Sequence, residues 1–408
     1  MKPVIYCFSA VDFSALKWYI AYVLVFFTKK LYAVFNSKAK KETIMQNNTY
    51  GFIGLGLIGG SLAKALRLAF PDCKIIAFDL DFNALTLARE DVVDEVYNGV
   101  GEAFGACDII FLCTPVDYNT EYLEQIKAVK KDSCIITDVG SVKKTIHDAV
   151  SSLQLNHCFI GGHPMAGSEH SGYAASRAGL LENAYYILTP GTSVSYTCVE
   201  QMQALIKAIG AIPIVMSQEK HDKVTAAISH LPHMAAYALV HLIEQSDDED
   251  ETMKIIAAGG FKDITRIASS SAVMWQQICG ENKEQLLAFM DKYITSLSSL
   301  REQIADENAS YLLDYFKDAK DYRDSFDDVI SGPIKRSYRV AVSIPDEAGI
   351  IAKISGMFAN EGINLKNMGI VHNREFEEGV LRLEMYDQES LDRSTELLKK
   401  YHYTVYER

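Results

Sequence analysis

From Thr49 to about Pro213, short apolar runs alternate along the chain with longer stretches in which apolar residues recur every three or four positions. The short runs are typical of buried strands and the longer stretches of amphipathic helices. This alternation predicts a doubly wound α/β domain, whose parallel sheet extends to roughly six or seven strands. The predicted strands are Tyr50–Ile53, Lys74–Phe78, Asp108–Cys113, Cys134–Asp138, Cys158–Gly161 and Tyr185–Leu188.

After Ser217 the pattern changes to long apolar-periodic stretches with almost no strand signal, which predicts an all-helical second domain. The acidic run Asp247–Glu251 is interpreted as a solvated loop between helices, because blocks of like charge repel one another. The predicted helical stretches are Val224–Glu244, Met253–Ser270, Trp275–Cys279 and Lys283–Phe316.

A polar stretch, Asp318–Asp328, and the residues Ser331–Pro333 predict a linker into a third unit. From Tyr338 the pattern gives strand, helix, strand, strand, helix and strand, ending at Thr404–Tyr406. This order is the ferredoxin-like βαββαβ arrangement. We therefore predict a doubly wound nucleotide-binding domain over 48–215, an all-helical domain over 216–331, and a ferredoxin-like domain over 336–408.

Residues 1–44 form an apolar and basic extension that three interpretations fit. Its segment Phe13–Phe27 is strongly apolar, yet it carries Lys17 and is shorter than a typical spanning helix. It is a signal anchor, a signal-peptide core, or a stretch before the true start at Met45. No small-residue cleavage site follows and the segment lacks arginine, so the third interpretation is favoured and no membrane association is expected. Intact-mass measurement on native protein decides between them.

Composition narrows the class of protein. The chain has 408 residues, of which 49% are hydrophobic and 23% charged, as in folded proteins of two or three domains. The formal charge of -13 argues against a nucleic-acid partner, so an anionic substrate needs a local basic pocket. The eight cysteines include no C-x-x-C pair, which favours reduced thiols in a cytoplasmic protein.

The first motif with a chemical meaning is G-x-G-x-x-G, directly after the first predicted strand. Its glycines allow a tight turn and a close backbone approach to a pyrophosphate, which the following helix N-terminus stabilises. Asp79 ends the next strand, where a carboxylate accepts bonds from a ribose 2'-hydroxyl and repels a 2'-phosphate, so NAD is favoured over NADP. Asp81 is a competing acid. The predicted cofactor-binding residues are Gly54, Gly56, Leu57, Ile58, Gly59 and Asp79.

Further polar groups follow later strands at the carboxyl edge of the sheet, where this fold builds its ligand crevice. Thr114 and Pro115 either wall the cofactor or simply end a strand and begin a helix. The loops 138–143 and 161–172 carry D-V-G-S-V-K and G-G-H-P-M-A-G-S-E-H-S-G. The imidazole of His163 is suited to remove a hydroxyl proton while a hydride leaves the same carbon. The alternative is a histidine that only caps its loop.

Together the motifs G-F-I-G-L-G-L-I-G-G-S, D-V-G-S-V-K, G-G-H-P-M-A-G-S-E, S-H-L-P-H and G-G-F-K-D-I-T-R-I-A resemble the prephenate dehydrogenase family. The resemblance covers nearly everything from Tyr50 to about Ser331. It implies oxidative decarboxylation of prephenate to 4-hydroxyphenylpyruvate with reduction of NAD, on the way to tyrosine, by a homodimer.

The same resemblance assigns roles to individual residues. It makes His163 the hydrogen-bond acceptor for the substrate hydroxyl, which Ser141 orients together with the nicotinamide. Arg266 binds the ring carboxylate, for which its planar fork is better suited than a lysine. His233 helps to bind the pyruvyl side chain, and Glu169 contributes to the site or gates it.

Two more features depend on the resemblance. His221 and Asp222 form an acid and histidine pair near the domain junction, and Trp275 contributes to substrate binding by reaching a site across a subunit interface. A tryptophan on a helix face is more often ordinary core. His230 and His233 have a spacing that also occurs in metal sites, but no third ligand is evident, so no metal is expected and His230 is interpreted as structural.

The C-terminal segments I-P-D-E-A-G-I-I-A-K-I and E-G-I-N-L resemble the ACT domain, a ligand-sensing module of amino-acid metabolism. Backbone amides of the loop from Asp346 to Gly349 would meet the carboxylate of an amino acid, and Asn364 would reach it from a neighbouring copy. The resemblance makes tyrosine the expected effector. The alternative is a domain that only dimerises.

Two other functions fit parts of the pattern. An arogenate dehydrogenase of the same fold would act on a substrate with an amino group in place of the keto group. A non-catalytic amino-acid sensor would keep the fold without the chemistry, but Ser141, His163 and Arg266 together argue against it.

Overall fold

The computed structural model describes residues 47–168, 170–326, 338–345, 347–371 and 379–406. The extension 1–44 and the predicted site residues Glu169 and Asp346 lie outside these residues. The chain divides into two compact units after Ile294, which are described separately. The domain limits given above stay a prediction.

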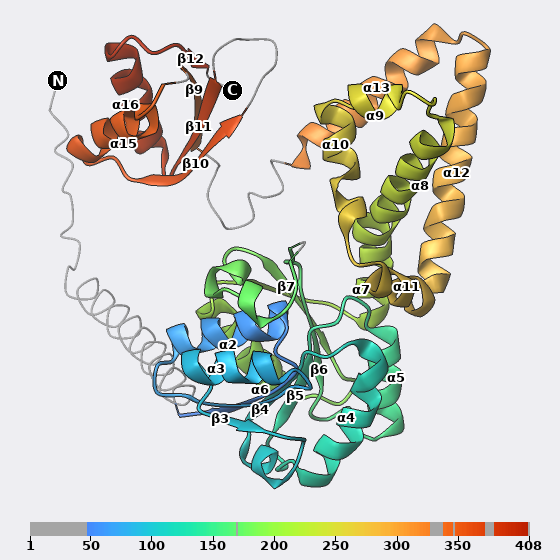
Figure 1. Ribbon diagram of the computed structural model, residues 1–408, viewed down its shortest axis with the longest axis vertical. Helices are drawn as coiled ribbons and strands as arrows, with labels where there is room; N and C mark the ends of the chain where they lie inside the picture. Colours follow the sequence, from blue (N-terminus) through green and yellow to red (C-terminus); the bar gives the residue numbers. More distant parts are fainter. Residues whose placement is uncertain (1–46, 169, 327–337, 346, 372–378, 407–408) are drawn as a thin grey trace, which may run out of the picture. The chain divides into compact units, whose positions relative to one another are not determined.

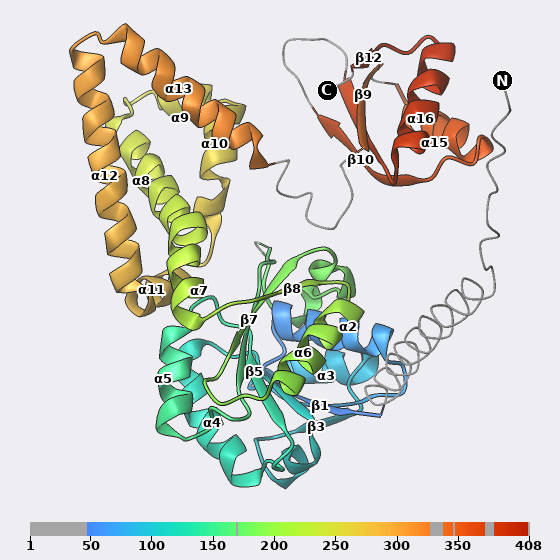
Figure 2. The ribbon, with the colours of Figure 1, turned by 180° about the vertical axis from the view of Figure 1, so that it is seen from behind.

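The first unit begins with a five-stranded parallel sheet in the order β3-β2-β1-β4-β5 (Figure 1). Its two faces are buried by different helices, so apolar runs fill the strands completely. Leu62 of α2 and Met202 of α6 belong to one core cluster, and Leu123 of α4 and Ile146 of α5 belong to the other (Figure 2). The strands are β1 (Thr49–Ile53), β2 (Lys74–Phe78), β3 (Glu95–Tyr97), β4 (Ile109–Leu112) and β5 (Ile135–Asp138). The helices are α2 (Leu57–Ala69), α3 (Phe82–Asp91), α4 (Val116–Val129), α5 (Lys144–Ser152) and α6 (Tyr196–Ala208).

The remaining strands correct the prediction of one longer parallel sheet. β6 (Ile160–Pro164), β7 (Tyr185–Pro190) and β8 (Ile212–Val215) form a separate three-stranded sheet, in which β6 and β7 are antiparallel. A single parallel bridge from Ile136 to Phe159 connects it to β5. His163 therefore lies on a strand, opposite Ile187, and not in a loop after one.

A helical region follows and begins with one continuous helix of 29 residues, Gln218–Ser246. It consists of α7 (Gln218–Thr225), a π-helical turn η4 (Ala226–His230) and α8 (Leu231–Ser246). The acidic run then caps α9, because carboxylates of Asp247 and Asp248 accept backbone N–H groups at its start. The other helices are α9 (Thr252–Ile256), α10 (Gly259–Thr265), η5 (Arg266–Ser269), α11 (Ala272–Glu281) and α12 (Lys283–Ala305).

The second unit holds the end of α12, then α13 (Ala309–Asp324) and a small α+β domain. Its antiparallel sheet has the order β10-β11-β9-β12, and both helices pack with it in one core around Val342, Phe358 and Leu398. The strands are β9 (Tyr338–Ile344), β10 (Leu365–Val371), β11 (Gly379–Met385) and β12 (Val405–Tyr406), and the helices are α15 (Ile350–Asn360) and α16 (Gln388–Lys400). This is the βαββαβ order expected from the sequence.

Candidate active site

The turn between β1 and α2 is shaped by the glycine motif. Gly54 has a φ of +96°, and a Cβ there would lie 2.7 Å from the carbonyl oxygen of Cys113. A Cβ on Gly59 would lie 2.3 Å from the carbonyl oxygen of Gly54. A Cβ on Gly56, in contrast, would meet no described atom within 4 Å. The protein's own packing thus accounts for the first and third glycines, and the second leaves backbone open to a pyrophosphate at the start of α2.

The two candidate acids at the end of β2 have different hydrogen-bond partners in the structure. The carboxylate of Asp79 accepts the backbone N–H of Leu55 in the glycine turn and, at 2.7 Å, that of Asp81. The Asp81 carboxylate instead caps α3 by accepting the N–H of Asn83 at 2.9 Å. Each carboxylate oxygen of Asp79 keeps a second acceptor position, which suits a ribose hydroxyl beside the turn. These residues fit a bound NAD.

The predicted wall residues and the first turn of α2 lie around the same glycine turn. Leu57 and Ile58 begin α2. The Thr114 hydroxyl donates to the side-chain oxygen of Asn119 at 2.7 Å, and Pro115 directly precedes α4. Thr114 therefore has a structural partner in α4, and its role as a wall of the cofactor stays a prediction.

A buried ion pair lies beneath the loop that carries Ser141. Asp138 and Lys143 are fully buried and paired with each other. The Asp138 carboxylate also accepts the N–H of Gly140 at 2.9 Å and the N–H of Gly162 at 3.0 Å. A buried charge is tolerated when it is paired and hydrogen-bonded in this way. The pair holds the loop of Ser141 against β6, one residue before His163.

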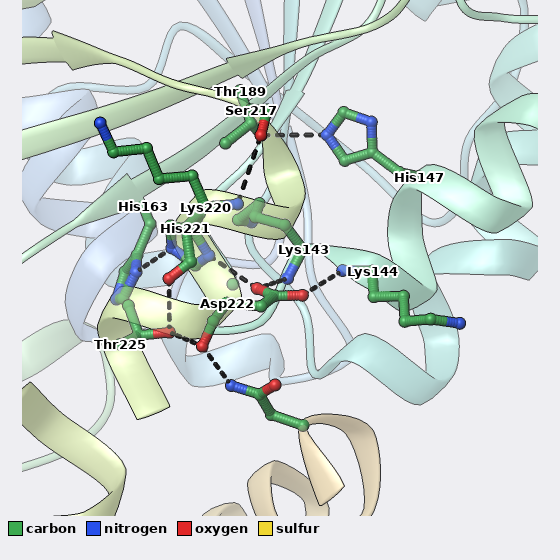
Figure 3. Close-up of polar contacts among 12 residues, drawn as sticks. Lys143, Lys144, His147, His163, Thr189, Ser217, Lys220, His221, Asp222 and Thr225 are labelled. Carbon is green, nitrogen blue, oxygen red and sulfur yellow. Dashed lines mark hydrogen bonds and ion pairs between the residues drawn. The ribbon is translucent and has the colours of Figure 1, made fainter. Parts of the chain in front are cut away.

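The side chain of His163 begins a chain of hydrogen bonds that crosses into α7 (Figure 3). Its Nδ1 lies 2.8 Å from Nε2 of His221, and Nδ1 of His221 lies 2.7 Å from Oδ1 of Asp222. The Asp222 carboxylate also accepts the backbone N–H groups of Lys143 and Lys144, each at 2.8 Å. His221 and Asp222 were expected only as a pair. Their hydrogen bonds thus orient His163 through its Nδ1 atom.

This arrangement fixes the tautomers of both rings. A carboxylate can only accept, so Nδ1 of His221 carries its hydrogen and Nε2 accepts. Nδ1 of His163 must then be the donor. The lone pair of His163 is consequently on Nε2, the nitrogen that does not face His221.

Electrostatics keep these imidazoles neutral. Burial lowers the pKa of His163 well below 6.5, and the neighbouring His221 and Lys143 lower it further. Burial also lowers the pKa of His221, against the opposing effect of Asp222. A neutral His163 with its lone pair on Nε2 is the state that a general base requires.

A second group of aromatic rings lies along the same helix. Nδ1 of His233 donates to the carbonyl of Ser229 at 2.8 Å, and its ring lies 3.9 Å from the ring of Trp275. Trp275 also meets His230 edge to face at 5.8 Å. Trp275 is buried against histidines of its own chain, so these contacts need no subunit interface. Among the described residues, no group of three or more potential ligands is placed to hold a metal.

Two predicted substrate-binding residues, Arg266 and Glu169, are not among the residues that the structure brings together around His163. Arg266 is exposed and begins η5, which packs against α8, the helix of His233. Among the described residues, it makes no hydrogen bond or ion pair. Glu169 lies outside the described residues. The structure therefore brings together His163, the loop of Ser141 and the α7 pair, and it leaves Arg266 on a neighbouring surface.

Sequence reasoning missed Asn282, which is buried between α11 and α12. Its side-chain nitrogen donates to the Asp222 carbonyl at 2.8 Å and lies 3.2 Å from Nδ1 of His230. A lone Asn at a helix junction gives no sequence signal, because the same residue is common as a cap. The buried Lys143 was quoted within its motif but given no role, although a lysine among apolar residues usually has a buried partner.

Comparisons with known proteins identify similar chains. Residues 62–215 match the family described as prephenate dehydrogenase, nucleotide-binding domain, and residues 217–318 match prephenate dehydrogenase, dimerization domain. A prephenate dehydrogenase of Bacillus subtilis is 39% identical over 362 residues, which cover 88% of this chain and 96% of that protein.

Solved structures are similar over about two thirds of the chain. A prephenate dehydrogenase from A. aeolicus, in complex with hydroxyphenyl propionate and NAD+, has a TM-score of 0.64 at 32% identity and covers 68% of this chain and 98% of its own. An arogenate dehydrogenase from Synechocystis has a TM-score of 0.62 at 29% identity and covers 68% of this chain and 99% of its own.

Proposed function

Because this chain belongs to the prephenate dehydrogenase family, we propose that His163, oriented by His221 and Asp222, is the base of its reaction. The chain oxidises prephenate with NAD, releasing carbon dioxide and 4-hydroxyphenylpyruvate. The observation that carries the role of His163 is the hydrogen-bonded chain to Asp222, which leaves an acceptor nitrogen on a neutral imidazole.

The residues of the chain have to orient and deprotonate the substrate. Bound NAD supplies the hydride acceptor. Nε2 of His163 takes the hydroxyl proton, and the resulting cation is stabilised through His221 by the Asp222 carboxylate. Ser141 orients the hydroxyl. Loss of the carboxylate beside a forming aromatic ring supplies driving force, so placement of groups dominates the catalysis.

The test of this function is a substrate panel. Purified protein is mixed with prephenate or arogenate and with NAD or NADP, and reduced cofactor is followed by absorbance. We expect NADH formation with prephenate and NAD. The similarity to an arogenate dehydrogenase makes arogenate the second candidate substrate. A strong arogenate preference would overturn the choice of prephenate, and no turnover with either would leave the amino-acid sensor.

We predict that Arg266→Ala raises the KM for prephenate about 10- to 100-fold, with a smaller effect on kcat. A guanidinium pairs with a carboxylate through charge-assisted hydrogen bonds, and because Arg266 is exposed we expect the pair to contribute about as much as one such bond, about 1.5–3 kcal/mol. The exposed position of Arg266, on the turn that packs against α8, leaves its side chain available to a ligand. Steady-state kinetics give both constants, and an unchanged KM would remove the carboxylate-binding role.

The helical region supports a homodimer. The helix Gln218–Ser246 is long and apolar enough to cross a membrane by length and composition alone, and little of it is buried within the chain. Leu239, Val240 and Leu242 are among its exposed apolar residues. A second copy covers such a surface in a cytoplasmic dimer, and the matched dimerization family supports this choice over a membrane. Sedimentation equilibrium without detergent measures the mass.

The C-terminal domain is proposed to be an ACT domain that binds tyrosine. Gly349, with a φ of +91°, precedes α15, and Asn364 lines a pocket of about 360 Å³ near the other end of that helix. The alignment with the Bacillus protein is longer than the span 62–318, so it extends beyond the two matched families. Asp346, the third proposed effector residue, lies outside the described residues.

Deleting Tyr338–Arg408 is expected to leave prephenate turnover in place and to abolish inhibition by tyrosine. Allosteric inhibition requires a coupling free energy between two sites, and removing one site removes the coupling. The measurement is the tyrosine dependence of the initial rate for the full chain and the truncated chain. Inhibition that persists after truncation would place the effector in the active site.

A further inference from the structure

The helix that carries His221 and His233 contains a π-helical turn between them, Ala226–His230, which the reaction as described does not use. The N–H of Leu231 bonds to the carbonyl of Ala226, five residues earlier instead of four. A π turn therefore absorbs one extra residue, and such turns are rare and frequently lie at functional sites. The helix continues on both sides without a break.

The extra residue changes which side chains share a face. At about 100° per residue, a regular α-helix would place His230 roughly 180° and His233 roughly 120° away from His221. With one residue absorbed by the π turn, these angles fall to about 80° and about 20°. The surroundings of His230 agree with the second set. Asn282 contacts both the carbonyl of Asp222 and Nδ1 of His230, and His230 lies close enough to His163 to lower its pKa. His230 and His233 then share Trp275 as a neighbour.

Pro232 supplies a reason for the turn. A proline inside a helix has no N–H to donate, and its ring clashes with the carbonyl four residues earlier, here that of Ile228. Widening the preceding turn relieves the clash. Ile228 itself is 64% exposed, so its side chain adds little to the core.

Asn282 clamps the turn from outside the helix. Its side-chain nitrogen donates to the carbonyl of Asp222, before the turn, and contacts Nδ1 of His230, the last residue of the turn. The carbonyl can only accept, which identifies the NH2 group, so Nδ1 of His230 accepts as well. Burial lowers the pKa of His230 to about 4, which keeps that nitrogen unprotonated.

We propose that the π turn Ala226–His230, clamped by Asn282, is a positioning element that sets His233 in register with the His163, His221 and Asp222 chain. Its role is to place the substrate side chain, bound by His233, at a fixed rotation from the base. The proposal rests on the function proposed above and adds to it the reason for the shape of this helix.

The test is a one-residue deletion with two matched controls. Deleting Ile228 should let the helix close as a regular α-helix, rotating His233 away from the base and lowering kcat/KM for prephenate about 100-fold. Ile228→Ala removes the side chain but keeps the register, so wild-type kinetics are expected. Deleting Ile228 and inserting an alanine after Lys223 restores the residue count, so most of the activity should return. The affinity for NAD should stay at the wild-type value in all three.

Wild-type kinetics in the deletion variant would overturn the proposal, as would a count-restored variant that binds NAD but stays as impaired as the deletion. Should the deletion variant not fold, Asn282→Ala decides at unchanged chain length. A raised KM for prephenate with unchanged NAD affinity supports the clamp, and unchanged kinetics overturn it. If the wild-type chain forms no NADH from prephenate, that result would instead contradict the proposed function.

Discussion

His163→Asn is expected to lower kcat by about 10³- to 10⁴-fold, near the upper range for loss of a general base. Asparagine is close in size to histidine, but its amide cannot take up the hydroxyl proton at neutral pH. The affinity for NAD should be unchanged, because the glycine turn and Asp79 are separate from this strand. Stopped-flow absorbance at saturating NAD and prephenate measures the chemical step.

The matched control is His241→Asn, in which a mostly exposed histidine of α8 receives the same substitution. It should keep wild-type kinetics. Turnover in His163→Asn close to that of the wild type would show that another group removes the proton, and the proposed mechanism would then be wrong.

The pH dependence of the wild type provides a second check on His163. The imidazole acts as a base only when it is neutral, and burial, together with His221 and Lys143, lowers its pKa well below 6.5. Lowering the pH through 6.5 therefore leaves His163 in the folded site neutral, although a free histidine would already be half protonated. We expect kcat/KM, which reports the free enzyme, to stay level to below pH 6.5 and to fall only in more acidic solution.

The elements of the nucleotide-binding domain were predictable where a local pattern determined them. The runs in β1, β2, β4 and β5 are apolar on both faces because helices bury both faces. The strand predicted over Cys158–Gly161 was expected to end too early, because Gly161 and Gly162 weaken the strand signal, and β6 instead continues to Pro164. The structure shows why they are there: a Cβ on Gly162 would lie 2.5 Å from the carbonyl of Asp138, so close contact with β5 requires glycine.

Individual residues of the site were predictable from the sequence, but the contacts between them were not. His163 and Ser141 follow strands whose carboxyl ends share an edge, and the resemblance added His221 and Asp222 as a pair. His163 and His221 are separated by 58 positions in the sequence, which gave no indication that the two rings touch. Pro232 suggested a position near the start of a helix. The helix instead continues across Pro232 by means of the π turn, and this turn depends on tertiary packing around Asn282.

Asp222→Asn is expected to lower kcat by about 10²- to 10⁴-fold, although residue 222 is not expected to touch the substrate. The Asp222 carboxylate accepts three hydrogen bonds, from the backbone N–H groups of Lys143 and Lys144 and from Nδ1 of His221. An asparagine has one oxygen and one NH2 group. One orientation therefore sets its NH2 against the N–H of Lys144, and the other sets it against Lys143 and His221.

In the second orientation His221 must accept on Nδ1 and carry its hydrogen on Nε2. That hydrogen points at His163, which then accepts on Nδ1 and holds its own hydrogen on Nε2, the nitrogen that has to receive the substrate proton. The base is present but in the wrong tautomer. Asp148→Asn is the matched control, because this carboxylate is 63% exposed and pairs with the Lys144 side chain at 3.3 Å. Near-normal kcat in Asp222→Asn, with NAD binding intact, would show that His163 keeps its tautomer without the carboxylate.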